Sequence, residues 1–182
     1  MSVPATPGTT RVDPPAGSTL VGLKFHQFGM MMFPYYSIRQ LGDDFQCAQT
    51  SSELYWAPMD SAETLEYLTH SSEGYAYDEY AGGDPLATSA RYSSALVSAD
   101  ALSELSDQLA AAGAYGWDGF HKVRTPPPGL EVLDGGDGFD LALLLSDGSH
   151  VRAHGQESYP PGYDLMVEAL RDFFDRHVNW SE

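Results

Sequence analysis

The sequence predicts an α+β fold, an antiparallel meander sheet with two main helices packed on one face in a two-layer arrangement. Segments that alternate between apolar and polar residues predict the strands, because successive side chains of a strand point to opposite faces. Two segments near residues 98–112 and 162–178 instead repeat apolar residues at helical spacing. The chain has 182 residues, of which 42% are hydrophobic, so it can bury a core of its own.

The predicted strands occur in two groups, and the second is a hairpin in the last third of the sequence. In the first group, Cys47 alternates with polar neighbours and shares a strand face with Phe45. We therefore expect the thiol of this single cysteine to be buried rather than reactive. The strands of the first group are expected at residues 20–28, 35–41, 44–50 and within 88–97.

The register of the hairpin follows from its side chains. A two-residue turn would place the apolar residues of one strand on the same face as the charged residues of the other. A three-residue loop with Gly148 in a left-handed conformation instead pairs Leu143 with Val151 and sets Asp140 opposite His154. The apolar face then consists of Phe139, Leu141, Leu143, Leu145, Val151 and Ala153.

Capping residues predict where the helices begin and end. Ser98 is an N-cap residue for a helix that should stop at Gly113. A last helix should begin near residues 162–164, end about Val178 and pack on the apolar face of the hairpin. A capping box predicts a short helix within residues 60–70. The apolar stripes of the two long helices are Leu102, Leu105 and Leu109, and Met166, Leu170, Phe173 and Phe174.

Residues 1–18 are rich in Pro, Thr and Gly and contain almost no large apolar side chains. Ordering such a segment costs conformational entropy that apolar burial does not offset, so we expect a disordered tail. Residues 19–182 are expected to form a single α+β domain. The sequence opens without a signal peptide and has no apolar run that could span a bilayer, which predicts a soluble, cytoplasmic protein.

The charge balance argues against two classes of partner. The chain has 26 acidic and 9 basic residues, a formal net charge of −17 at pH 7. Nucleic acids and anionic lipids are bound by clustered Lys and Arg, so neither is an expected partner. Residues 40–90 contain no Lys or Arg, which concentrates negative charge in that half. A basic protein is the charged partner that this composition favours, and a solvated acidic face is the simpler interpretation.

Three aspartates near the hairpin are candidate metal ligands: Asp134, Asp137 and Asp140. The residues around them match one copy of a calcium-binding β-helix repeat, and a single copy supplies half a site. Glycine and aspartate before a strand are also ordinary turn chemistry, which is the simpler interpretation. His150 and His154 lie roughly 13 Å apart along a strand at ~3.3 Å per residue, too far to share one zinc ion.

The last third of the sequence contains a set of short motifs. They are Trp117-Asp118-Gly119-Phe120, Leu133-Asp134-Gly135, Phe139-Asp140-Leu141, Asp147-Gly148, Ala153-His154-Gly155 and Tyr159-Pro160. Together with Gly29-Met30, they resemble a family of uncharacterised bacterial α+β proteins. The resemblance covers residues 23–174 with gaps and implies a shared fold, with no assigned activity or site residues. This chain differs in its long acidic middle and in lacking a lipoprotein-type leader.

These observations leave three classes of function open. The first is a non-catalytic interaction protein whose acidic half binds a basic protein partner by electrostatic steering. The second is a calcium- or metal-dependent binder or hydrolase that uses the three aspartates. The third is a small-ligand-binding module with a pocket between sheet and helices. The sequence contains no common catalytic or cofactor-binding motif, so we expect no catalytic residues and no cofactor, and favour the first class.

Overall fold

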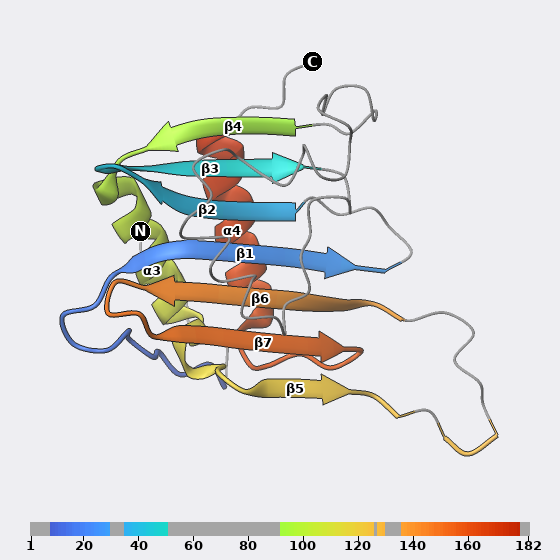
Figure 1. Cartoon of the computed structure of the whole chain (residues 1–182). Helices are drawn as coiled ribbons and strands as arrows, with labels where there is room; N and C mark the ends of the chain where they lie inside the picture. Colours follow the sequence, from blue (N-terminus) through green and yellow to red (C-terminus); the bar gives the residue numbers. More distant parts are fainter. Residues whose placement is uncertain (1–7, 30–34, 51–91, 126, 130–135, 179–182) are drawn as a thin grey trace.

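A computed structural model of the chain describes residues 8–29, 35–50, 92–125, 127–129 and 136–178. Their strands form one seven-stranded sheet in the order β4-β3-β2-β1-β6-β7-β5 (Figure 1). The strands are β1 (Leu20–Phe28), β2 (Tyr35–Leu41), β3 (Asp44–Thr50), β4 (Tyr92–Val97), β5 (Phe120–Val123), β6 (Gly138–Leu145) and β7 (His150–Gln156). The helices are α3 (Ala99–Ala111), the short 3₁₀ helix η3 (Ala114–Gly116) and α4 (Tyr163–His177).

The sheet is mixed rather than wholly antiparallel. Strands β1 to β4 pair antiparallel with their neighbours in sequence, and β1 also pairs antiparallel with β6. Strand β5, however, runs parallel to β7. Two hydrogen bonds to the Arg152 backbone hold the residues just before β5. The Gly119 N–H donates to the Arg152 carbonyl at 3.0 Å, and Asp118 Oδ1 accepts from the Arg152 N–H at 2.9 Å. The α+β class is thus confirmed with a mostly antiparallel sheet, and the two-layer arrangement stays a prediction.

The predicted hairpin register is confirmed. Leu143 pairs with Val151, and Asp140 pairs with His154, across β6 and β7. The three-residue loop closes with a hydrogen bond from the Gly148 N–H to the Leu145 carbonyl at 2.9 Å. Gly148 has φ of 84°, the left-handed conformation that glycine adopts without steric cost. Local turn chemistry and strand alternation therefore determine which face of the hairpin joins the core.

Both long helices lie on the same side of the sheet in Figure 1 and bury the stripes that the sequence predicts. Ser98 caps α3 by accepting a hydrogen bond from the Ala101 N–H at 3.3 Å. Gly162 precedes α4, and Val178 follows it. The helical stripes and the apolar face of the hairpin belong to one hydrophobic cluster, which also contains Cys47. The exposed fraction of Cys47 is 0%, as the sequence predicts.

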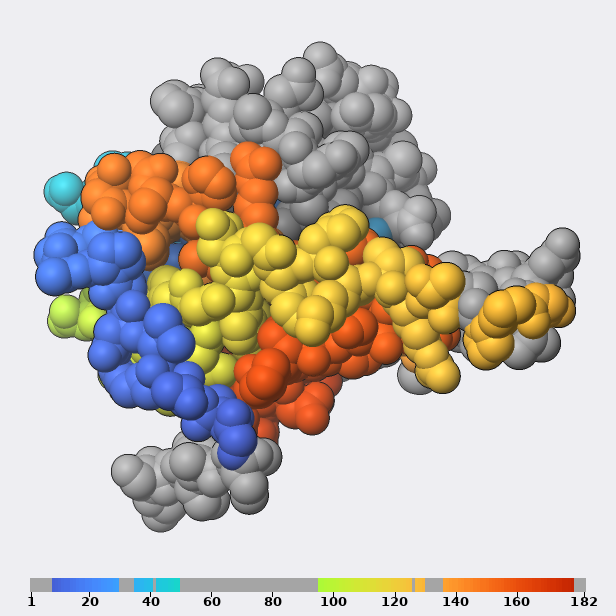
Figure 2. Space-filling model, turned by 90° about the horizontal axis from the view of Figure 1, so that it is seen from below, coloured from blue at the N-terminus to red at the C-terminus, as the bar shows by residue number. Residues whose placement is uncertain are grey.

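Residues 8–18, part of the tail expected at residues 1–18, contact helix α3. The Val12 N–H donates to the Ala110 carbonyl at 3.0 Å, and the Val12 side chain packs against the core cluster. Arg11 bonds Asp107 on α3 at 2.6 Å. The Ala110 carbonyl also accepts from the Gly113 N–H at 2.9 Å, so Val12 adds a second donor at the end of α3. Figure 2 shows these blue residues lying on the surface beside the yellow-green residues of α3.

Two further predictions have separate outcomes. The last strand of the first group is confirmed as β4, which begins at Tyr92. The short helix expected within residues 60–70 and most of the acidic stretch 40–90 lie outside the described residues. Within the described residues, no helix is long and apolar enough to cross a membrane.

Candidate functional site

A row of ionisable side chains crosses four neighbouring strands. His26 on β1 pairs with Asp140 on β6, Asp140 pairs with His154 on β7, and His154 pairs with His121 on β5. Residues directly paired across strands share a face of the sheet. These four residues alternate with core residues such as Phe25, Leu141, Ala153 and Phe120, so the row lies on the face of the sheet opposite the helices.

The closest contact in the row joins Asp140 and His154. Asp140 Oδ1 lies 2.6 Å from His154 Nδ1, and the two side chains are 18% and 28% exposed. The imidazole of His154 is stacked with Phe28 at 5.8 Å and with His121 at 5.0 Å between ring centroids. A carboxylate bonded to one ring nitrogen fixes the orientation of the imidazole. The second nitrogen of the ring is then the atom through which the pair could act on a ligand.

Two neighbouring basic groups on this face are unusually buried. Burial lowers the pKa of His26 to about 4, and its ring stacks on Tyr35 with centroids 3.7 Å apart. Lys24 is 1% exposed, and burial lowers its pKa to about 8. Desolvation disfavours the charged form of both groups. The face thus differs from an ordinary solvated strand surface, because burial favours the neutral form of both groups.

Of the three aspartates predicted as weak metal candidates, Asp137 and Asp140 lie within the described residues. Asp140 bonds His154, Asp137 is exposed, and Asp134 lies outside the described residues. Among the residues that the structure describes, no group of three or more His, Cys, Asp or Glu side chains could hold a metal ion. His150 is exposed near the hairpin loop and lies apart from His154, as expected for residues four apart on a strand.

The outer surfaces of the two helices are strongly acidic. Helix α3 has three acidic residues and no basic one, and α4 has four acidic residues and two arginines. All nine side chains are exposed. The described helices therefore present an excess of five negative charges on the side of the sheet away from the histidine row. The acidic residues are Asp100, Glu104, Asp107, Asp164, Glu168, Asp172 and Asp175.

Sequence reasoning found the Asp140–His154 pair and missed the rest of the row. The alternation of β1 could have placed Lys24 and His26 on one face, because Leu23 and Phe25 are apolar. His121 carried no such signal, since β5 has only four residues and follows a glycine turn. Pairing β1 with β6 is a long-range contact that no local pattern predicts.

Comparison with known proteins finds no matching family model, no significantly similar curated protein and no significantly similar solved structure. The resemblance to a bacterial family that the sequence motifs predict therefore stays a prediction. The function has to be argued from the surfaces and side-chain contacts described above.

Proposed function

We propose that this protein is a non-catalytic interaction protein that binds a basic protein partner through the exposed acidic surfaces of α3 and α4. One observation carries the proposal: these helices have seven exposed acidic residues and two exposed arginines. The whole chain has the same sign, with a formal net charge of −17. The proposal places the acidic contact on the helices, whereas the sequence alone pointed to residues 40–90.

Electrostatics of this kind acts mainly on the rate of encounter. Charged patches of opposite sign raise association rate constants above the ~10⁵–10⁶ M⁻¹s⁻¹ of uncharged interfaces, and salt removes the gain. Exposed charges are screened within about 8 Å at physiological ionic strength. A basic partner should therefore bind the helix surface faster at low salt, and the equilibrium affinity should fall as salt rises.

The test compares two variants of equal charge. Glu168→Gln with Asp172→Asn removes two negative charges from the middle of α4. Asp43→Asn with Asp44→Asn removes two from the exposed turn before β3 and the first residue of β3. Immobilised wild type should retain a basic protein from the native organism at low salt and release it at high salt. The α4 variant should retain much less of it, while the β3 variant should behave like wild type.

Equal loss of the partner in both variants would show that net charge, rather than the helix surface, determines binding. Retention of no specific basic protein by the wild type at low salt would overturn the proposal. Circular dichroism of both variants gives the control for folding, because all four side chains are exposed and should not alter stability by more than about 0.5 kcal/mol.

The Asp140–His154 pair favours a second candidate, a hydrolase in which His154 acts as a general base. Its support is the 2.6 Å contact, since a positioned imidazole typically contributes about 10²–10⁴-fold to a reaction. Ester, phosphoester and peptide substrates tested with wild type and His154→Gln would decide it. Rates that are the same for both proteins would remove the candidate.

A further inference from the structure

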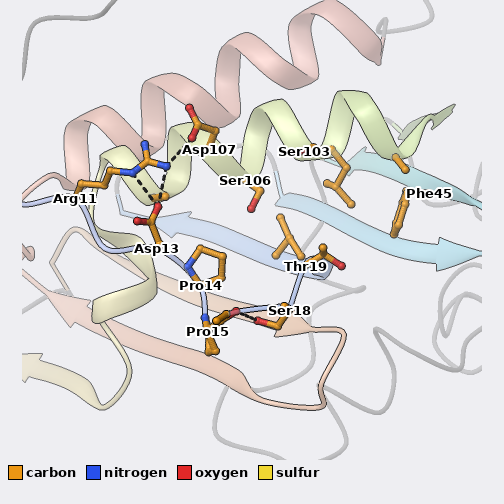
Figure 3. Close-up of a pocket in the computed structure, with 16 residues that line it drawn as sticks. Arg11, Asp13, Pro14, Pro15, Ser18, Thr19, Phe45, Ser103, Ser106 and Asp107 are labelled. Atoms are coloured by element: carbon orange, nitrogen blue, oxygen red, sulfur yellow. Dashed lines mark hydrogen bonds and ion pairs between the residues drawn. The ribbon is translucent and has the colours of Figure 1, made fainter.

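A cavity between the N-terminal segment and helix α3 has a lining with both charged and apolar residues. It has a volume of about 450 Å³ and is lined by residues 11 and 13–20, by Phe45 and by one side of α3. Figure 3 shows the labelled residues around it. Sites for small organic molecules typically measure ~300–1,000 Å³, so the cavity has a suitable size.

One end of the cavity is apolar. Leu20, Phe45 and Leu102 line it, with exposed fractions of 3%, 7% and 2%. Ala110 is 1% exposed and lines the cavity nearer the charged end, one helical turn beyond Asp107. These side chains belong to the edge of the hydrophobic core. Apolar groups of a ligand would lose contact with water here, which is favourable in proportion to the buried area.

The other end carries three charged side chains. Arg11 bonds Asp13 at 2.8 Å and Asp107 at 2.6 Å, and Figure 3 shows the three groups together, away from Phe45. One guanidinium and two carboxylates leave a net charge of −1. In both contacts the carboxylate uses Oδ1. Within the described residues neither Oδ2 makes a hydrogen bond, and a carboxylate can accept several.

Hydroxyl groups lie between the two ends. Thr19, Ser103 and Ser106 point toward the cavity between the charged cluster and Phe45 (Figure 3). Ser106 also bonds the Tyr115 hydroxyl at 2.6 Å. The first turn of α3, which contributes Ala99, has Asp100 near the positive end of the helix dipole. An anionic ligand group would meet the carboxylates of Asp13 and Asp107 at the charged end of the cavity.

We propose that this cavity binds a small organic cation, an amine with an apolar body. The ammonium group would contact the Oδ2 atoms of Asp13 and Asp107, and the apolar body would extend toward Phe45. The polarity of the cavity carries the proposal, because its charged and apolar ends are separated along one line (Figure 3). The site shares Asp107 with the proposed acidic surface of α3 but no residue with that of α4, so the Glu168 and Asp172 changes test the proposed function separately.

The experiment uses three probes of equal skeleton: 4-phenylbutylamine, 4-phenylbutanol and 4-phenylbutyrate. Each is titrated into the full chain while backbone amide signals of Phe45 and Ser103 are followed by NMR at pH 7 and physiological salt. The amine should bind about three- to fivefold more tightly than the alcohol, the effect expected for an exposed ion pair. The carboxylate should bind more weakly than the alcohol.

Matched variants locate the site. Asp107→Asn should remove the advantage of the amine over the alcohol, while Glu104→Gln removes one charge from the same helix outside the lining and should leave it unchanged. Ser103→Phe should fill the cavity and weaken the amine and the alcohol alike. Equal affinity for all three probes, tighter binding of the carboxylate, equal effects of the Asp107 and Glu104 changes, or no binding at millimolar concentration would each overturn the proposal.

Discussion

The approach of α4 to α3 allows one prediction to be worked in detail, because two glycines provide a matched pair. Gly162, the N-cap of α4, and Gly148, in the hairpin loop, both have φ of 84°. A Cβ added to Gly148 meets nothing within 4 Å. A Cβ added to Gly162 would overlap the carbonyl oxygen of Ala112 and lie 2.9 Å from Thr9 Cγ2. Alanine at both sites thus separates backbone strain from the contact between the helices.

The expected magnitudes follow from these surroundings. Left-handed backbone costs a non-glycine residue ~1–2 kcal/mol, and alanine recovers ~0.4–1 kcal/mol by restricting the unfolded chain. Gly148→Ala should therefore lower the free energy of unfolding by about 1 kcal/mol or less. Gly162→Ala adds an overpacking cost of ~1–3 kcal/mol, because the Ala112 carbonyl is backbone and cannot rotate away. We expect a total loss of about 2–4 kcal/mol for Gly162→Ala.

Equilibrium urea denaturation followed by circular dichroism measures both changes. The midpoint of Gly162→Ala should fall well below that of Gly148→Ala, with similar slopes, because slope reports the surface exposed on unfolding. Equal losses in the two variants would refute the reasoning, since they would mean that the start of α4 does not lie against the end of α3.

Three further predictions concern the core and the titrating groups. Leu143→Ala should destabilise the protein by ~2–5 kcal/mol, because Leu143 is 0% exposed. Leu96 is 61% exposed, so Leu96→Ala should cost less than about 0.5 kcal/mol. The urea midpoints of the two variants measure the difference. Cys47, whose pKa burial raises to about 12, should resist alkylation at pH 8 in the native protein and react fully in urea, and rapid native labelling would contradict its burial. Because burial lowers the pKa of His26 from 6.5 to about 4, the unfolded chain binds the proton more tightly, and stability should fall as pH drops from 6.5 towards 4. His26→Gln should reduce that fall. The same pH dependence of the urea midpoint in the variant and in wild type would contradict the role of His26.

The features that sequence predicted correctly depend on nearby residues. The hairpin register followed from strand alternation and the Gly148 loop, and the start of α3 followed from Ser98. Each is a choice among a few local geometries, and the wrong choice would have exposed apolar residues or buried charged ones. The buried stripes of α3 and α4 are predictable for the same reason, because helical periodicity brings their members to one side.

The features that sequence could not predict depend on contacts between distant segments. The parallel pairing of β5 with β7 joins Phe120 to Ala153, and no alternation in four residues predicts it. Residues 8–18 were expected to lack order because a lone Val12 buries little apolar surface. What composition could not show is that the Ala110 carbonyl at the end of α3 accepts the Val12 N–H.

The strand order gives the two sides of the described structure different charge. The central pairing of β1 with β6 places Lys24 beside Ala142, which in turn pairs with Arg152, on the face opposite the helices. Arg39 of β2 alternates with the core residue Ile38 and therefore also lies on this face. These three basic side chains and Asp140 lie on the opposite side of the sheet from the exposed acids of the helices, so among the described residues the helix side carries more negative charge. A basic partner would therefore be attracted to the helix surface, which is why removing charge from α4 should matter more than removing the same charge from β3.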